Sequence, residues 1–165
     1  MRSVGEPEGG DAVVHDNATA RAIINRLDLA PHPEGGWYRQ TWRAETPNRT
    51  GDGTVDGARP TATAIHFLLE AHQRSHWHRI DAAELWFWHA GAPVKLLIAA
   101  DDGETPREIR LGADVLSGEQ PQVLVPTGHW QAAEPQGGWA LVSCVVSPGF
   151  EFAGFTLAPS GWSPG

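Results

Sequence analysis

The residues of this sequence with the greatest chemical potential lie together in the stretch SHWHRIDAAELWFWHAG, residues Ser75–Gly91, which holds three histidines, three tryptophans and one glutamate. Alternate residues of a β-strand point to the same face, so His76 and His78 are expected to project together. A tight turn then leads to Glu84 on the neighbouring strand. Two imidazoles and a carboxylate on adjoining strands form a ligand set for Fe, Mn, Ni or Zn that leaves positions open for water or substrate.

A fourth metal ligand is available further along the chain. The turn Pro126-Thr-Gly128 restarts a strand, on which His129 or Gln131 could face inward. A buried, hydrogen-bonded cluster without a metal uses the same residue types, and spacing alone does not separate the two interpretations.

A second polar patch, EGGWYR, covers Glu34–Arg39. Tyr38 is a candidate proton donor or acceptor. Arg39 is either a clamp for a carboxylate or phosphate or a structural ion pair with an acid such as Glu84 or Asp81. Glycines at positions 35 and 36 allow the backbone to pass close to something bulky, such as a ligand or another chain.

Further side chains are candidates for substrate contact, with core packing as the alternative for several of them. They are His66, Trp86, Trp88, His129 and Trp130. His32 lies in a loop and is assigned no role, and Cys144, in an apolar run, is interpreted as a buried, inert thiol.

The surrounding pattern predicts an all-β domain with a short N-terminal helix. Residues 1–15 are expected to form a disordered or loosely held arm. Asn17 is expected to cap a helix whose apolar side carries Ala20, Ile23, Ile24 and Leu27. Residues 45–60 are expected to be a mobile loop. The remaining chain, to residue 165, is expected to be a single domain of short strands at 36–43, 61–69, 85–90, 94–100, 108–111, 122–125 and 139–146. Short, evenly spaced strands are typical of a closed sandwich or barrel.

Composition excludes several classes of protein. The net charge is −8, with 12 basic against 20 acidic side chains, so no nucleic acid is expected as a partner. No apolar run is long enough to cross a bilayer and no secretory signal is visible, which predicts a cytoplasmic protein without a membrane partner. The pattern shows no alternation of strands and helices, so a parallel nucleotide-binding sheet is not expected, and no organic cofactor is expected.

Several blocks together resemble a known family. His76-x-His78, Glu84 and Gly91 look like the first cupin motif, and Pro126-x-Gly128 followed by Gln131 looks like the second. More specifically, LAPHPEGGWYR from residue 29, SHWHR from 75, DAAELW from 81, VPTGHWQ from 125 and VSPGFEF from 146 resemble cupin family 5, a domain of unknown function. These blocks run in order over nearly the whole globular part of the chain.

The resemblance implies a double-stranded β-helix of the jelly-roll type, a small-molecule ligand inside the barrel and pairing into a homodimer. Cupin metal centres typically hold three histidines and a glutamate, whereas this chain has Gln131 at the last position. An amide oxygen is a weaker ligand than an imidazole, so the metal set His76, His78, Glu84 and Gln131 departs from the family pattern.

Three functions follow from the sequence. The first is an enzyme that uses a divalent transition metal on a polar or anionic metabolite, of oxygenase, isomerase or lyase type. The second is a metal-free epimerase or isomerase in which His78 is the base, Glu84 orients it and Tyr38 is the acid. The third is a barrel that captures a small ligand without turnover.

Overall fold

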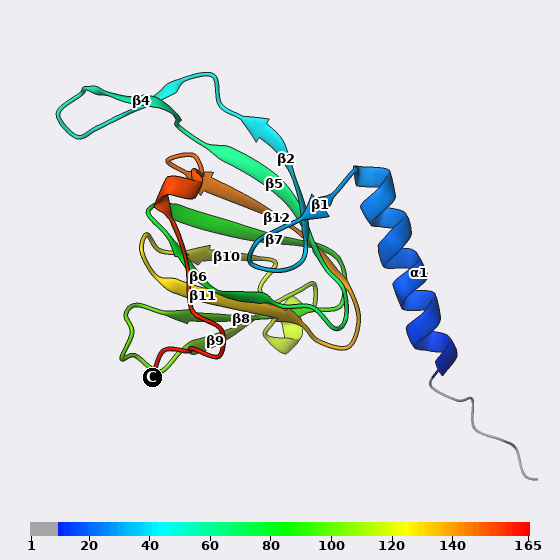
Figure 1. The fold of residues 1–165 in the computed structure, drawn as a ribbon. Helices are drawn as coiled ribbons and strands as arrows, with labels where there is room; N and C mark the ends of the chain where they lie inside the picture. Colours follow the sequence, from blue (N-terminus) through cyan, green and yellow to red (C-terminus); the bar gives the residue numbers. More distant parts are fainter. Residues whose placement is uncertain (1–9) are drawn as a thin grey trace, which may run out of the picture.

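Two antiparallel β-sheets face each other and form a jelly-roll barrel (Figure 1), which confirms the predicted fold class. The computed structural model describes residues 10–165. The six-stranded sheet has the order β1-β2-β5-β12-β7-β10, and the five-stranded sheet has the order β13-β6-β11-β8-β9. The strands of the first sheet are β1 (Ala30–Pro31), β2 (Trp37–Arg43), β5 (Thr63–Leu69), β12 (Ala140–Ser147), β7 (Ala83–Gly91) and β10 (Gln122–Val125). Those of the second are β13 (Phe155–Leu157), β6 (Ser75–Ile80), β11 (Trp130–Pro135), β8 (Val94–Ala99) and β9 (Arg107–Leu111).

The space between the two sheets is divided along the strands. One half is filled by a core of buried side chains that includes Phe67, Trp86, Leu96 and Val142. Toward the other end of the same strands, the inward positions instead line a pocket. On β7, for example, Trp86 belongs to the core, while Glu84, two residues earlier on the same face, reaches the pocket.

Helix α1 (Gly10–Leu27) packs outside the barrel, against the outer side of the six-stranded sheet (Figure 1). Its buried residues Ala20 and Ile24 contact Leu68 of β5, with Ile23 and Leu27 beside them, so the predicted apolar side of the helix is confirmed. The helix begins seven residues before Asn17, so the expected cap at Asn17 is wrong. The expected arm falls partly on this helix, and residues 1–9 lie outside the described residues.

The segment expected to be a mobile loop contains a hairpin instead. Strands β3 (Pro47–Arg49) and β4 (Val55–Pro60) pair antiparallel and extend away from the barrel (Figure 1). Its tip is closed locally, because Thr50 donates its backbone N–H to Thr54 and Gly53 donates to Thr50, each at 2.8 Å. Single-turn 3-10 helices, η1 (Val115–Ser117) and η2 (Phe152–Gly154), complete the fold. Among the described residues, no helix has the length and apolar character needed to cross a membrane.

Candidate functional site

A pocket of about 280 Å³ lies inside one end of the barrel, between β6 and the strands of the six-stranded sheet. The side chains that could do chemistry there are His32, Glu34, Tyr38, His78, Glu84 and Cys144. The apolar part of the wall comes from Ile65, Ile80, Val146, Phe150 and Phe152. No lysine or arginine is found among the described residues that line this pocket.

His78 is held in one orientation at the centre of the site. Its ring is buried, with only 2% of the residue exposed. Because a carbonyl oxygen can only accept, Nδ1 must donate its proton to the backbone carbonyl of His76, at 2.8 Å. The other nitrogen, Nε2, lies 3.2 Å from Oε2 of Glu34. Burial lowers the pKa of His78, although Glu84 and the hydrogen bond to His76 act in the opposite direction.

Glu34 reaches His78 from a tight loop between β1 and β2. Within the loop, His32 and Gly36 are joined by a backbone hydrogen bond of 2.9 Å, and Gly35 donates to the carbonyl of His32 at 3.0 Å. The loop is docked on β6, where the backbone N–H of His76 donates to the carbonyl of Glu34 at 2.7 Å.

Gly35 makes that docking possible. Its φ of 104° is in the left-handed region, and a Cβ atom there would lie 2.1 Å from the carbonyl oxygen of Arg74. A residue other than glycine would therefore force the loop away from β6. The paired glycines of the EGGWYR patch bring backbone close to another segment of the same chain.

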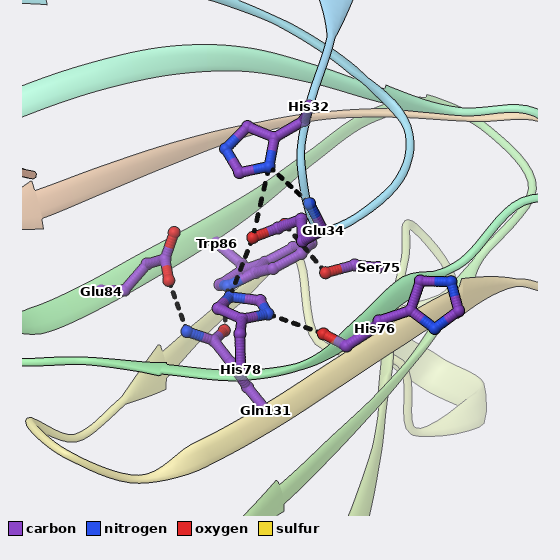
Figure 2. A network of polar contacts seen from close by, with 8 residues as sticks. All are labelled: His32, Glu34, Ser75, His76, His78, Glu84, Trp86 and Gln131. Atoms are coloured by element: carbon purple, nitrogen blue, oxygen red, sulfur yellow. Dashed lines mark hydrogen bonds and ion pairs between the residues drawn. The ribbon is translucent and has the colours of Figure 1, made fainter. Parts of the chain in front are cut away.

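The hydrogen bonds around Glu34 define where the protons are (Figure 2). Ser75 donates its hydroxyl to Oε1 of Glu34 at 2.8 Å. The backbone N–H of Glu34 donates to Nδ1 of His32 at 3.2 Å, so this nitrogen carries no proton and the His32 ring is neutral. Burial raises the pKa of Glu34 to about 8, and the Ser75 hydrogen bond opposes this. Burial, and to a smaller extent His78, lowers the pKa of His32 to about 4.

Glu84 lies on the opposite side of the pocket, at the end of a hydrogen-bonded chain (Figure 2). Trp86 donates its indole N–H to Oε1 of Gln131 at 2.9 Å, and Nε2 of Gln131 donates to Oε2 of Glu84 at 2.6 Å. Burial raises the pKa of Glu84 to about 7, with His78, Gln131 and Cys144 acting in the lowering direction and Glu34 in the raising direction. Burial also raises the pKa of the Cys144 thiol well above its ordinary value, as expected for an inert, buried cysteine.

The expectation that His76 and His78 share a face is wrong. His78 is buried, whereas His76 is exposed and its ring points away from the cluster (Figure 2). The cause is a β-bulge: Gln131 pairs with His78 and Ala133 pairs with Ser75, so β6 has one residue more than β11 between the two pairs. The extra residue breaks the alternation, and Ser75 and His78 both face inward. His76 nevertheless serves the site through its backbone, which binds both Glu34 and His78.

The side chains present do not fit the predicted metal set. The indole N–H of Trp86 can only donate, so the oxygen of Gln131 must face it and the amide nitrogen must face Glu84. Gln131 therefore offers no oxygen to the pocket, and the ring of His76 lies outside it. In the described part of the chain, no group of three or more His, Cys, Asp or Glu side chains is arranged to hold a metal ion.

Most of the predicted substrate contacts lie away from the pocket. Arg39 faces outward and pairs with Asp28 at 3.7 Å, rather than with Glu84 or Asp81. Asp81 is bound by Arg59 instead. His66, the partner of Arg39 across β2 and β5, also faces outward.

The tryptophans and His129 that were predicted to contact substrate lie in other parts of the barrel. Trp86 is a core residue that reaches the site only through Gln131, and Trp88 donates its indole N–H to the carbonyl of Ala92 at 3.0 Å. Trp130 donates to Asp102 at 2.7 Å, and His129 lies in a separate surface hollow. Tyr38 does line the pocket, with its ring edge-on to His32 at 4.5 Å between centroids.

Two residues of the site, His32 and Glu34, were not found from the sequence. Both lie in the loop between β1 and β2, where no spacing pattern joins them to His78. The available signal was the glycine pair after Glu34, which indicated a close backbone approach without saying to what. The pocket residues Phe150 and Phe152 follow the last long strand and likewise had no pattern to distinguish them.

A jelly-roll barrel with a polar pocket between its sheets defines the cupin class of proteins. Residues 21–158 match the family described as Cupin superfamily (DUF985). The chain therefore belongs to this family, and the resemblance found in the sequence blocks is confirmed.

Solved structures and a curated relative agree with this assignment. A protein of Shewanella oneidensis is 39% identical, with a TM-score of 0.76, over 84% of this chain and 84% of that one. A hypothetical protein from Leishmania major is 34% identical, with a TM-score of 0.75, over 84% of this chain and 86% of that one. An uncharacterized protein of Saccharomyces cerevisiae is 28% identical over 85% of this chain and 75% of its own length. At 13% identity and a TM-score of 0.53, oxalate decarboxylase from Bacillus subtilis shares the fold alone, over 79% of this chain and 30% of its own.

Proposed function

We propose that this cupin is an isomerase-type enzyme that moves a proton within a small molecule bound in the pocket, without a metal. The observation that carries the proposal is the buried contact between Nε2 of His78 and Oε2 of Glu34, at 3.2 Å. The raised pKa of Glu34 and the lowered pKa of His78 support a protonated carboxyl that donates to a neutral imidazole. Such a pair offers a proton donor and a proton acceptor at neutral pH.

A closed catalytic cycle follows from this pair. The substrate enters between the two groups, and the O–H of Glu34 gives its proton to one substrate atom. Nε2 of His78 takes a proton from a neighbouring C–H, so that a C–H bond breaks and its electron pair stays in the substrate. The imidazolium then returns its proton to the Glu34 carboxylate, which restores the starting state. No oxidant, reductant or other reactant is consumed.

The remaining polar groups of the pocket support this chemistry. Glu84 raises the pKa of His78, so it stabilises the imidazolium that forms during the cycle. The carbonyl of His76 holds Nδ1 and fixes the tautomer, which leaves Nε2 free to accept. Tyr38 is placed to donate to or accept from a substrate oxygen.

A metal-dependent enzyme has less support. Of the predicted ligands, His78 and Glu84 line the pocket, but the ring of His76 faces outward and the oxygen of Gln131 is bound by Trp86. The described lining of the pocket also has no lysine or arginine to pair with the anionic metabolite that was predicted. Pairing into a homodimer stays a prediction, to which the exposed Trp42 and Leu124 lend support.

The experiment is hydrogen exchange into candidate substrates. Aldoses, ketoses, amino acids and hydroxyketones are incubated with the protein in D₂O, and deuterium incorporation is followed by mass spectrometry. We expect incorporation with one compound class, and at least a hundredfold loss of rate in His78→Gln and in Glu34→Gln, in line with the usual contribution of roughly 10²–10⁴ from acid–base groups.

The matched control is His76→Gln, which changes the same residue type two positions away but outside the pocket. It is expected to keep the wild-type rate. Activity that disappears with a chelator and returns with a divalent metal contradicts the proposal and favours the metal enzyme. A compound that binds tightly without any exchange favours the binding barrel.

A further inference from the structure

Among the described residues that line it, the pocket has two acids and two histidines but no lysine or arginine, which limits what it can bind. We propose that its ligand carries a positively charged nitrogen, as in a small organic amine, rather than the anionic group predicted from the sequence. This inference rests on the pocket being the ligand site of the proposed function, and it adds the class of ligand.

The charge inside the pocket follows from its hydrogen bonds. His32 is neutral, because its Nδ1 accepts the backbone N–H of Glu34. Nε2 of His78 and Oε2 of Glu34 lie 3.2 Å apart, and the raised pKa of Glu34 supports one proton between them at pH 7, which makes the pair neutral whichever partner holds it. None of these groups leaves a net positive charge for an anion.

Glu84 is the group that a cation would meet. Its Oε2 accepts from the amide of Gln131, and the Cys144 thiol also hydrogen-bonds to its carboxyl. These two donors stabilise the ionised form of the carboxyl, against the burial that raises its pKa to about 7. The charge of the pocket is therefore between zero and minus one.

Nearby arginines are committed elsewhere and do not alter this balance. Arg39 donates to the carbonyl of Leu27 at 3.4 Å and pairs with Asp28 on the outer side of the sheet. Arg59 is bound to Asp81 and to the carbonyl of Gly149. An anion that entered the pocket would lose its hydration with no opposite charge to replace it, which is costly.

The apolar wall indicates an organic cation rather than a hydrated metal ion. The side chains of Ile65, Ile80 and Val146 form an apolar surface in the pocket, and the rings of Tyr38 and Phe152 lie at the same pocket. An ammonium group attached to an apolar body can pair with Glu84, while its body contacts this wall and its charge is favoured near aromatic faces.

The test compares three probes of nearly the same shape: benzylammonium, benzyl alcohol and benzoate. Their binding to the wild-type protein is measured at pH 7 by isothermal titration calorimetry. We expect benzylammonium to bind about tenfold more tightly than benzyl alcohol, as is typical of hydrogen bonds to a charged group, and benzoate not to bind. Equal or tighter binding of the alcohol or of benzoate overturns the proposal, and so does failure of benzylammonium to bind.

A variant locates the charge. Glu84→Gln keeps the shape and an oxygen that can accept from Gln131, and we expect it to reduce the preference for benzylammonium over the alcohol to less than about threefold. The matched control is Glu134→Gln, which removes a carboxylate that pairs with Lys95 and Arg74 outside the barrel. A preference that survives in Glu84→Gln overturns the assignment to Glu84. The wild-type comparison remains decisive if this variant does not fold.

These outcomes are independent of the exchange experiment. Selective binding of benzylammonium together with no deuterium incorporation from any compound would leave the ligand class standing and remove the isomerase. Exchange into a sugar or hydroxyketone that carries no charged nitrogen, together with no preference for benzylammonium, would leave the isomerase standing and remove the ligand class.

Discussion

The two halves of the barrel interior are built on the same strands and differ in what those strands place inside. In the closed half, β12 contributes Val142 to a dry core, and in the pocket half the same face contributes Val146 to a cavity wall. On β7 the corresponding pair is Trp86 and Glu84. The closed half supplies packing energy, whereas the pocket half contains buried acids and imidazoles that are costly to hold there. The residues that stabilise the fold and the residues that could do chemistry thus occupy opposite ends of the same strands, rather than different sheets.

Gln131 joins the two halves, so its removal should have the largest effect. Gln131→Leu leaves the indole N–H of Trp86 without an acceptor and removes one hydrogen bond from the carboxyl of Glu84, which keeps that of Cys144. We expect the free energy of unfolding to fall by about 2–4 kcal/mol, from roughly 1–3 kcal/mol for the unpaired indole N–H and about 1 kcal/mol for the lost hydrogen bond to the carboxyl. Urea unfolding measures it. In a Trp86→Phe background the same change should cost less, and an equal cost in both backgrounds would contradict the coupling.

The buried acids of the pocket half should make stability depend on pH. The folded chain keeps a proton on Glu34 up to a pKa of about 8 and on Glu84 up to about 7, whereas the ordinary value is 4.5. The folded state therefore binds more protons than the unfolded state in this window, and the free energy of unfolding falls as pH rises. His32 and His78, with lowered pKa values, act in the opposite direction, but only below their ordinary value of 6.5.

Above pH 6.5 only the acids remain. Between pH 6.5 and 8 we expect a loss of about 2 kcal/mol, at roughly 1.4 kcal/mol per proton and pH unit. Urea unfolding at several pH values checks this. Glu34→Gln should flatten most of the slope, while Glu134→Gln should not. Stability that is constant or rises across this range would show that Glu34 is ionised in the folded state.

A matched pair on one strand isolates the difference in packing. Val142→Ala opens a cavity in the closed half, whereas Val146 packs with Ile80 and Ala82 but also borders the pocket, so Val146→Ala mainly enlarges a space that already exists. We expect the first to lower the free energy of unfolding by about 2–3 kcal/mol and the second by about 1 kcal/mol less, since the transfer term is shared and the cavity term is not. Equal losses by urea unfolding would indicate that the pocket end is packed as tightly as the core.

The smallest effect is expected outside the barrel. The ring of His76 is exposed and its backbone, not its side chain, holds the site. His76→Ala should change the free energy of unfolding by less than about 0.5 kcal/mol, as for other exposed positions. The measurement is the thermal unfolding of His76→Ala compared with that of His78→Ala. A loss as large as that of His78→Ala would mean that the His76 side chain does reach the site.

Much of the fold was accessible from local pattern. Alternating apolar residues between turn signals located the strands, because a half-buried strand must alternate. The segment at 45–60 was predicted as a loop because glycine, proline and aspartate are shared by loops and by hairpins with little core contact. The start of the helix was misplaced because Asn17 is a good cap by type, while the helix extends well before it.

The site was less accessible, because it depends on tertiary contacts. His78 and Glu84 were expected on neighbouring strands; both do line the pocket, but β6 and β7 belong to different sheets, so the expectation of adjoining strands is wrong and the two side chains approach each other across the barrel. Glu34 meets His78 only because a loop with a left-handed Gly35 docks on β6. The orientation of the Gln131 amide is decided by Trp86 on another strand, which no count of residues along the chain predicts.

The extra residue in β6 has a consequence for reading relatives of this chain. In a regular strand, Ser75 and His78, three positions apart, would point to opposite faces. The bulge in β6 places both side chains inside the barrel instead. Without Trp77, Ser75 and His78 would be two positions apart in a regular strand, and both side chains would still face the interior. A one-residue alignment gap at Trp77 can thus leave the residues that line the barrel unchanged. A one-residue gap elsewhere in β6 would instead exchange the inward-facing and outward-facing side chains beyond it.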